Sequence, residues 1–486
     1  MADGKTDCAS ARELFAIDTR SLALFRVLLG AMLLADLSKR ALSLVAHYTD
    51  QGVLPRAELS ALGVGPLFAP LHRLGGSPEF QGALFALAGL LAILLILGWR
   101  TRLVAVLSFV LLMSLQQRNW LVLHVGDELL RFLLLWGIFL PLGERWSLDA
   151  RRRGRSPRTE ILSVASVALL LQTVFVYVGA THSKLQYEPW LEGHALYAVL
   201  NKATYATPLG TWLLQFPEFL RGMTWGALAF EGLAPVLLFI PWRYGPIRSL
   251  TVLGNVYFQV SIWLTLSIGL IQPITIVAAL PFLPPWFWDQ LRARVRSLEC
   301  RTSVVAAVPR WLWKPLPDAL CSAALAYVVA SNLLSFSVEL RRMPEPLGRL
   351  GQTLLLDQRW HMFANTDATV QGWFRVLGYL ESGMPVDVVH GTPAESLERP
   401  ELYALSFPNH NWRIYWSRIA QQEFAGFRPY LVDYYCREWN QKAPSDLRAA
   451  TLEIVHVKER AIRPGEATLP EASRLIRRSC PDGQAT

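Results

Sequence analysis

The chain has 486 residues, of which 52% are hydrophobic and only 17% are charged, and its formal net charge is +9. Its mean hydropathy is positive, and several apolar runs reach the roughly 20 residues that span a bilayer, which excludes an ordinary soluble enzyme. Much of the arginine lies in short loops between these runs, where basic residues set membrane topology. We therefore expect a lipid bilayer, and no nucleic acid, as the partner of this basic chain.

Residues 1–20 form a polar N-terminal segment without a small-residue cleavage site after a short apolar core. This is unlike a cleaved signal peptide, so the first apolar helix is expected to serve as an uncleaved signal. The predicted fold is an all-α polytopic membrane protein, with a transmembrane domain over residues 21–340. Hydropathy and helix breakers predict nine spans, near residues 21–45, 80–98, 102–118, 127–142, 160–182, 224–242, 247–267, 270–286 and 317–337.

The loops between these spans differ in charge. With a cytoplasmic N-terminus, the inside loops are GWRTR, PLGERWSLDARRRGRSPRTE, PWRYGPIRS and the long basic loop from Asp289 to Leu316. The opposite loops carry fewer positive charges for their length, as expected outside the cytoplasm. An odd number of spans then makes the C-terminal region periplasmic or extracellular in a bacterial inner membrane. If the seventh and eighth spans form one broken helix, the last helix and the C-terminal region have the opposite orientation across the membrane.

Residues 341–486 are richer in charge and contain no further run of spanning length. The alternating stretch from Phe374 to His390 turns at Ser382-Gly383 and predicts a hairpin. ATLEIVHVKERAI predicts another strand, and the stretch from Asn411 to Gln441 predicts a helix. Together they indicate a small α+β extracytoplasmic domain.

Two of the five cysteines, Cys436 and Cys480, fall in this exported domain. An oxidising compartment permits a disulfide between them. Two separate buried thiols are the alternative, because the sequence gives no Cα separation. We predict the disulfide.

Common catalytic motifs are absent from the sequence. The chain has no nucleophile elbow, no phosphate-binding glycine loop, no CxxC and no HExxH, and its nine histidines show no metal-ligand spacing. A standard hydrolase or metalloenzyme is therefore disfavoured and no metal is expected. A transporter remains open, because charged residues inside spans are candidates for function.

The charged residues inside the predicted spans are few, and most are three or four residues apart. They are Asp36, Lys39, Arg40, Asp127, Arg131 and Glu231. Residues at this spacing share a helix face and can neutralise one another. Two interpretations stay open: internal ion pairs that fix helix packing, or a polar wall around a cavity.

The stretch YVGATHSKLQYEPWLEG, Tyr177 to Gly193, ends the fifth predicted span. Tyr177, Thr181 and Lys184 recur at steps of four and three, so one helix face carries all three; Gln172 is a polar group deeper in the span. A lysine at a helix end commonly extends its ammonium to the interface. The alternative is a desolvated lysine, which loses its proton more easily and can act as a base.

The segment after Lys184 is rich in aromatic residues, from Trp190 to about Phe219. It predicts interfacial helices on the non-cytoplasmic side. They would roof a cavity or simply anchor the chain at the interface.

Three sequence motifs stand out: QTVFVYVGATHSKL…WLEG, LVLHVGDELLRFLLLWGIFLPLGERWSLD and LSIGLIQP. Together they resemble vitamin K-dependent γ-glutamyl carboxylase and its bacterial relatives, the HTTM (horizontally transferred transmembrane) domain proteins. The resemblance covers residues 12 to about 290, with a weaker similarity through QRWHMFANT, Gln358 to Thr366. The matching residues are Gln172, Tyr177, Lys184, Leu185, Trp190, Glu192 and Gly193 in the first motif, and Trp146, Ser147 and Asp149 in the second.

In that family a lysine is the proposed base that deprotonates vitamin K hydroquinone. The hydroquinone then reacts with oxygen, the resulting alkoxide removes a γ-proton from a substrate glutamate, and the carbanion takes up carbon dioxide. The resemblance therefore implies Lys184 and His124 as catalytic residues and reduced vitamin K or a related quinol as cofactor. Carbon dioxide and oxygen would be co-substrates. The implied cofactor-binding residues are Tyr177, Gln172, Gln259, Asn255, Trp190, Glu192 and Gly193.

The chain differs from the family at two positions of the motifs. Ser183 stands where the family has the first lysine of a pair, and Gln259 stands where it has a histidine, with Asn255 one turn earlier. The large luminal region that holds the carboxylase's propeptide is also missing. The sequence thus favours a carboxylase-like membrane enzyme with a quinol-type cofactor or lipid-phase substrate, possessing an extracytoplasmic face for a protein or peptide substrate. The alternative is a non-catalytic scaffold, maturation factor or self-protection factor.

Overall fold

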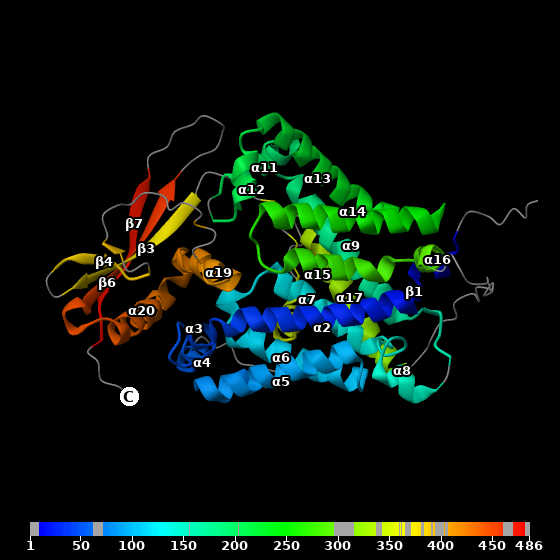
Figure 1. The fold of residues 1–486 in the computed structure, drawn as a ribbon, viewed down its shortest axis with the longest axis horizontal. Coiled ribbons are helices and arrows are strands. Elements are labelled where there is room, and N and C mark those ends of the chain that lie inside the picture. Colours follow the sequence, from blue (N-terminus) through cyan, green and yellow to red (C-terminus); the bar gives the residue numbers. More distant parts are fainter. Residues whose placement is uncertain are drawn as a thin grey trace, which may run out of the picture.

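The structure is a computed structural model of the chain. It shows a bundle of long helices joined at one end to a small sheet with its own helices (Figure 1). It describes residues 9–61, 71–154, 156–202, 204–295, 315–336, 343–358, 360, 362–364, 371–380, 383–389, 392–393, 403, 407–459 and 470–481.

Most long helices of the bundle run along the longest axis of the molecule (Figure 1). Each predicted span overlaps one of them. They are α2 (Thr19–Ala41), α5 (Pro78–Leu97), α6 (Thr101–Arg118), α7 (Val125–Phe139), α9 (Val164–Lys184), α13 (Pro217–Leu237), α14 (Tyr244–Thr265), α15 (Ile271–Ala279) and α17 (Pro315–Phe336).

Four helices in the described part of the chain are long and apolar enough to cross a bilayer: α2, α5, α9 and α17. A fifth candidate is bent by 93°, where α15 and the 3-10 turn η3 (Leu280–Phe282) meet α16 (Pro285–Val295). The other long helices are shorter or more polar. For example, α7 has 15 residues and spans about 22 Å, less than the roughly 30 Å of a bilayer core. The chain therefore has several membrane-spanning helices, and the count of nine stays a prediction.

The seventh and eighth predicted spans are separate helices. α14 and α15 pack against each other, and the turn between them contains Gly269 with a φ of +84°. A β-carbon at Gly269 would lie 2.7 Å from the ring of His410, so both the backbone and the space require glycine there.

Short elements complete the bundle at its two ends. The helices are α1 (Ala11–Phe15), α3 (Leu44–Tyr48), α4 (Arg56–Ala61), α8 (Leu148–Arg153), α10 (Glu188–Leu191), α11 (Ala195–Leu200), α12 (Pro208–Leu213) and α18 (Glu345–Thr353), with 3-10 turns η1 (Leu71–Arg73) and η2 (Trp120–Val122) and two short strands, β1 (Ile17–Asp18) and β2 (Glu160–Ile161).

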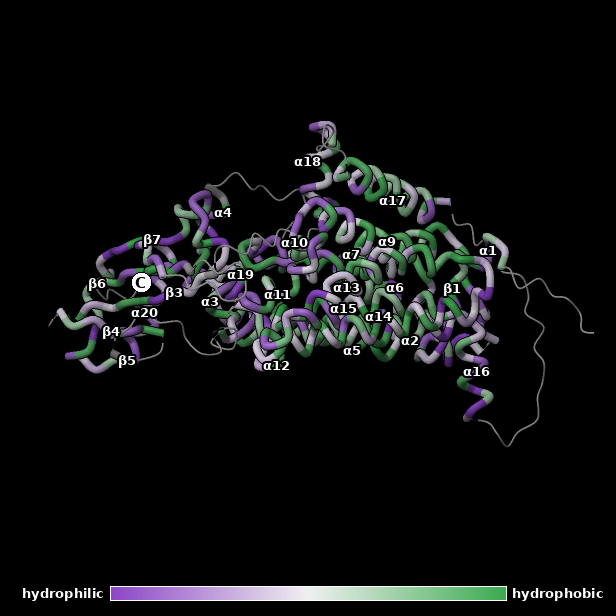
Figure 2. The backbone as a smooth tube through the Cα atoms, turned by 90° about the horizontal axis from the view of Figure 1, so that it is seen from above, coloured by the Kyte–Doolittle hydropathy of each residue, from purple (hydrophilic) through white to green (hydrophobic). Residues whose placement is uncertain are grey.

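Two helices with arginines in their last turn, α8 and α16, lie at the end of the bundle opposite the sheet (Figure 1). There β1 pairs with β2, and the carboxylate of Asp149 accepts hydrogen bonds of 2.8 Å from the backbone N–H groups of Arg100 and Thr101. Figure 2 shows that hydrophobic residues dominate the bundle, whereas the sheet region is mixed. The division of the loops between the two sides of a membrane stays a prediction.

The C-terminal region is a small α+β unit, as predicted. Its antiparallel sheet has the order β5-β4-β3-β6-β7, and its helices contact the bundle through Asn411, which donates to the Val122 carbonyl at 3.1 Å. The predicted hairpin is formed by β3 and β4, although Ser382, His390 and the boundary at Arg341 lie outside the described residues. The strands are β3 (Gln371–Leu380), β4 (Pro385–Asp387), β5 (Thr392–Pro393), β6 (Ala449–Glu459) and β7 (Glu471–Ser479).

The single helix expected from Asn411 to Gln441 is instead two helices. α19 (His410–Ile419) is followed by the 3-10 turn η5 (Gln422–Phe427) and α20 (Arg428–Lys442). Pro429 lies in the first turn of α20, where its missing N–H costs no hydrogen bond. A proline in a continuous helix would remove one such bond, which explains the break.

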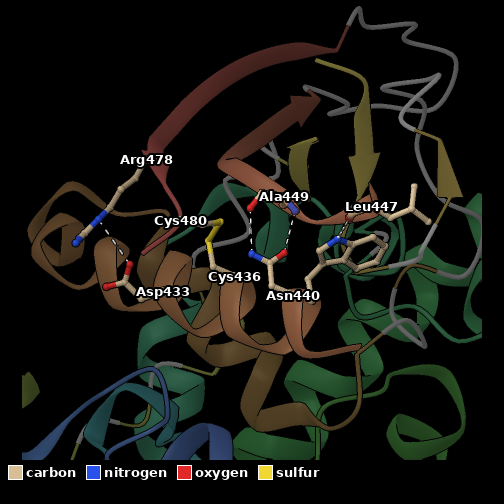
Figure 3. Close-up of a disulfide and its surroundings, with 8 residues drawn as sticks. Asp433, Cys436, Asn440, Leu447, Ala449, Arg478 and Cys480 are labelled. Atoms are coloured by element: carbon tan, nitrogen blue, oxygen red, sulfur yellow. Dashed lines mark hydrogen bonds and ion pairs between the residues drawn. A yellow bond between two sulfur atoms is a disulfide. The ribbon is translucent and has the colours of Figure 1, made fainter. Parts of the chain in front are cut away.

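The predicted disulfide is confirmed. Cys436 of α20 bonds Cys480, just after β7, with the Cα atoms 5.6 Å apart (Figure 3). One helical turn further on, the Asn440 amide exchanges two hydrogen bonds with the backbone of Ala449, at 3.1 and 2.8 Å. α20 is thus fastened covalently to one strand and by hydrogen bonds to its neighbour.

His47 of α3 is buried where the bundle meets the C-terminal domain. Its ring centroid is 4.4 Å from that of Trp412 and 5.8 Å from that of Tyr415. Neither ring nitrogen has a hydrogen-bond partner among the described residues. Burial, with a further contribution from the positive charge of Arg40, lowers the pKa of His47 to about 3. The contact between the two parts therefore holds this histidine neutral.

Acidification should weaken this contact. The unfolded histidine titrates near pH 6.5, so the free energy of unfolding is unaffected above that pH and falls as the pH drops toward 3. At pH 5.5 the loss from His47 is roughly 1.4 kcal/mol. His47→Phe keeps an aromatic ring and removes the titration. Thermal unfolding at pH 7.5 and 5.5 should show a smaller pH shift in this variant.

A residual pH shift is expected in both proteins, because His410 and His456 also have pKa values lowered by burial. Equal shifts in the wild type and His47→Phe would contradict a neutral, buried His47.

Candidate active site

α9 carries the polar face that the sequence predicts. The helix begins with a capping box in which the side chains of Ser163 and Ser166 each accept a hydrogen bond from the other's backbone N–H. Lys184 is its last residue, and Tyr177 lies two turns earlier on the same face. Both side chains are buried, so this face points into the protein.

Lys184 forms a buried ion pair with Glu231 of α13. Its Nζ bonds the Glu231 carboxylate, and the two residues are only 5% and 6% exposed. The ammonium also lies 4.6 Å from the centre of the Trp190 ring, a cation–π contact. The lysine thus extends into the protein and does not reach the surface.

Trp190 connects this ion pair to a distant part of the chain. Its Nε1 donates a hydrogen bond of 2.9 Å to the carbonyl of Phe363, and its side chain is buried. Phe363 has a φ of +52°, which is uncommon for a residue with a β-carbon. The Trp190 contact is one of the interactions that hold this strained residue in place.

Tyr177 is fixed by two residues of α14. Its hydroxyl donates to the Asn255 side-chain oxygen and accepts a hydrogen bond of 3.3 Å from the Gln259 amide. Asn255 and Gln259 are one turn apart, so both face α9. The structure therefore brings together three of the predicted cofactor-binding residues.

A small cavity of about 80 Å³ lies beside these groups. Its apolar wall comes from side chains of α9, α11, α14 and α15 and from Met362 and Phe363. Lys184 itself does not line it. Its polar lining residues are Tyr177, Glu231, Gln259, Gln272 and Thr275.

Several polar atoms at or beside the cavity lack hydrogen-bond partners among the described residues. They are both amide atoms of Gln272, the Asn255 nitrogen and the Thr181 hydroxyl. Gln272 is only 1% exposed. Buried polar groups normally find a partner, so these atoms are available to a bound molecule.

The cavity fits the polar end of a quinol in chemistry but does not fit the ring in size. Hydroxyl and carbonyl oxygens would find donors and acceptors here. However, an engineered cavity that holds benzene measures about 150 Å³, and small-molecule pockets usually exceed roughly 300 Å³. The cavity in this form is smaller than both, so a quinol ring requires its walls to move.

Gln172 has a different environment from the cavity residues. Its amide oxygen accepts from Trp136 at 3.2 Å and its nitrogen donates to Gln358 at 2.9 Å. Gln358 also accepts from Trp360 at 3.0 Å. Gln172 therefore ties α9 to α7 and to QRWHMFANT, away from the cavity wall, and its predicted cofactor role remains untested.

His124 lies in a separate cluster. It caps α7, where its Nδ1 accepts a hydrogen bond of 3.0 Å from the Gly126 N–H, and its ring is 4.7 Å from that of His410. Asp127 in the next turn pairs with Arg40, which also bonds Asp36 at 2.7 Å. His124 does not line the cavity, and its catalytic role stays a prediction.

The remaining charges in this region are arranged differently from their sequence spacing. Arg131 bonds the Gln116 side chain and, at 2.9 Å, the Leu355 carbonyl, and Lys39 is exposed. The Asp36–Arg40 pair described above confirms one predicted ion pair. Arg131 instead ties α7 to neighbouring segments.

The Trp-x-Glu-Gly motif forms a turn over the site. Gly193 has a φ of +85°, and a β-carbon there would lie 2.6 Å from the Arg221 side chain. Glu192 is exposed. Of this motif, Trp190 contacts Lys184, while Glu192 and Gly193 lie outside the cavity lining.

The Trp-Ser-x-Asp motif lies at the other end of the bundle. The Trp146 carbonyl accepts a hydrogen bond of 2.6 Å from the buried Arg26, and Ser147 caps α8. Asp149 of α8 accepts hydrogen bonds from the backbone at the start of α6, so this motif stabilises the basic end of the molecule.

Residues 15–288 match the family model of the HTTM domain. The chain belongs to the HTTM domain family. The match covers more than half of the chain, including Lys184, Glu231 and Gln272, and ends before the C-terminal sheet. With its apolar helices, it makes the chain a multi-pass membrane protein. No curated protein and no solved structure matches this chain.

Two residues of the site were not identified from sequence. The sequence marks Glu231 only as an intramembrane charge, because its pairing with Lys184 joins residues on different helices. Gln272 lies in LSIGLIQP, a motif noted only for its resemblance. Among the described residues, no group of three or more His, Cys, Asp and Glu side chains is placed to hold a metal ion.

Removing either partner of the Lys184–Glu231 pair alone should destabilise the protein. Lys184→Met leaves the carboxylate unpaired and Glu231→Gln leaves the ammonium unpaired, and a lone buried charge costs about 3–5 kcal/mol. The double variant removes both charges and should recover most of the loss. Thermal unfolding of the four proteins in one detergent measures the coupling. Simple addition of the two losses would contradict direct pairing.

Proposed function

We propose that this HTTM protein is a membrane enzyme that removes a proton from a lipid-phase substrate, with Lys184 as general base. One observation carries the proposal: Lys184 is buried and bonded to Glu231, which lines the cavity. An anchoring lysine would instead extend to the interface. Glu231 lies between the amine and the cavity, so it serves as the connection between Lys184 and the substrate.

The Lys184 ammonium of the ion pair must first release its proton to water, so the reactive form is a neutral Lys184 amine beside the Glu231 carboxylate. An acidic O–H group of the substrate gives its proton to the Glu231 carboxylate, and Glu231 passes a proton to the Lys184 amine. The substrate gains a negative charge and the lysine a positive charge, so the total charge is unchanged. The new ammonium stabilises the nearby anion, because such interactions are strong where water is excluded.

The identity of the substrate rests on the family resemblance. Reduced vitamin K or a related quinol, with carbon dioxide and oxygen as co-substrates, remains the prediction of that resemblance. No step is assigned to a quinol, since its ring exceeds the cavity volume. A scaffold that keeps only the fold is the alternative, and it requires no titratable group at position 184.

Lys184→Arg distinguishes the two functions. Arginine preserves the charge and can pair with Glu231, but it does not lose its proton at physiological pH. The loss of a general base costs on the order of 10²–10⁴ in rate, so the variant should fail to complement a deletion strain while reaching the membrane at normal levels. Lys184→Ala should also fail, and His124→Ala should be milder.

Lys39→Arg is the matched control, because Lys39 is an exposed lysine near the end of α2. It should complement fully. Full complementation by Lys184→Arg would exclude the general base and leave the scaffold.

The arrangement of loops supports an orientation for the protein. Basic residues favour the cytoplasmic side, and the basic end of the bundle lies opposite the sheet domain (Figure 1). We therefore place the sheet domain outside the cytoplasm, in a bacterial inner membrane with a cytoplasmic N-terminus. The Cys436–Cys480 disulfide fits an oxidising compartment.

A reporter that is active only in the cytoplasm should be silent when fused after Arg341. The same reporter placed in the basic loop after Arg152 should be active. Activity at the first position would reverse the orientation.

A further inference from the structure

Gln272 is a buried side chain without an assigned role. It lies in the first turn of α15, is 1% exposed and lines the cavity beside Glu231. Neither its amide nitrogen nor its amide oxygen has a partner among the described residues. It thus offers the N–H donors and the oxygen acceptor of its amide to a molecule in the cavity.

Gln172 provides a comparison within the same protein. It is equally buried, at 0% exposure, but both of its amide atoms are bonded, to Trp136 and Gln358. A buried amide that stabilises the fold has such partners. The unbonded amide of Gln272 makes no comparable contact, so a role in stabilising the fold does not explain why this amide is buried.

The charges of the cavity wall define the ligand further. Among the described residues that line it, Glu231 carries the charge, and Lys184 neutralises it from behind the wall. An anionic ligand would meet a carboxylate, and a cationic ligand would compete with Lys184. A neutral oxygen group can donate to Glu231 and accept from the Gln272 nitrogen.

The surroundings favour a ligand from the lipid phase. The remaining wall is largely apolar, and α13 and α14 expose large apolar side chains on their outer faces, among them Leu233, Val236 and Leu264. The cavity volume of about 80 Å³ admits only a small polar tip.

We infer that Gln272 is the recognition residue of the cavity and binds the oxygen of a neutral lipid that bears a hydroxyl group. This inference rests on the proposed function, because it places that oxygen beside Glu231, where the proton is removed. Gln272 orients the group, and its N–H stabilises the negative charge that develops on the oxygen.

Gln272→Leu tests the inference. The protein is purified from native membranes, and its extracted lipids are compared with the bulk membrane by mass spectrometry. The wild type should be enriched in a neutral lipid that bears a hydroxyl group. Gln272→Leu should lose this enrichment by about tenfold, the size expected for one or two lost hydrogen bonds. Its melting temperature should be unchanged or higher, because an apolar side chain replaces unbonded polar atoms.

Two control variants separate the possible failures. Gln172→Leu should lower the melting temperature, because it breaks bonds that exist. Lys184→Arg should keep the enriched lipid yet lose function. If Lys184→Arg keeps both the enriched lipid and full function, the proposed general base is excluded and the lipid-binding site is still supported.

Two results would overturn the inference. One is a wild-type extract that matches the bulk membrane. The other is a Gln272→Leu protein that keeps the enriched lipid, or that unfolds at a lower temperature with its lipid intact, as expected if Gln272 only supports the fold.

Discussion

The need to neutralise buried charge constrains this bundle more than any other single factor. An uncompensated ion inside a membrane protein is costly, so two of the buried charges pair with an opposite charge on another helix. Lys184 fixes α9 against α13 through Glu231, and Arg40 fixes α2 against α7 through Asp127. The cavity depends on the first of these pairs, because it holds the Glu231 carboxylate in the wall.

Sequence patterns predicted what is local or regular in this structure. Long apolar runs located the helices, the i, i+4 spacing located the Asp36–Arg40 pair, and compartment reasoning favoured the disulfide. Lys184 and Glu231 are 47 residues apart on different helices, and no periodic pattern links them. Strand β7 was also missed, since most of its residues are exposed and an edge strand need not show an apolar face.

The family motifs combine residues of different kinds. In the first motif, Tyr177 and Lys184 belong to the polar region beside the cavity, whereas Gln172 joins helices and Gly193 permits a turn. In the second, Asp149 and Ser147 hold a loop at the opposite end. Sequence resemblance marks all of them alike, and only their contacts distinguish a group available to a ligand from one whose bonds are complete.

The disulfide has a consequence for how the C-terminal domain withstands damage. Cys436 and Cys480 are separated by 44 positions, so the bond closes the end of α20, β6 and β7 into one covalent ring. A protease that cuts the backbone once within this ring produces a nick and releases no fragment. The severed strand stays beside its neighbours and can pair again, because the ends cannot diffuse apart. Such a cut would become visible as two pieces only after reduction.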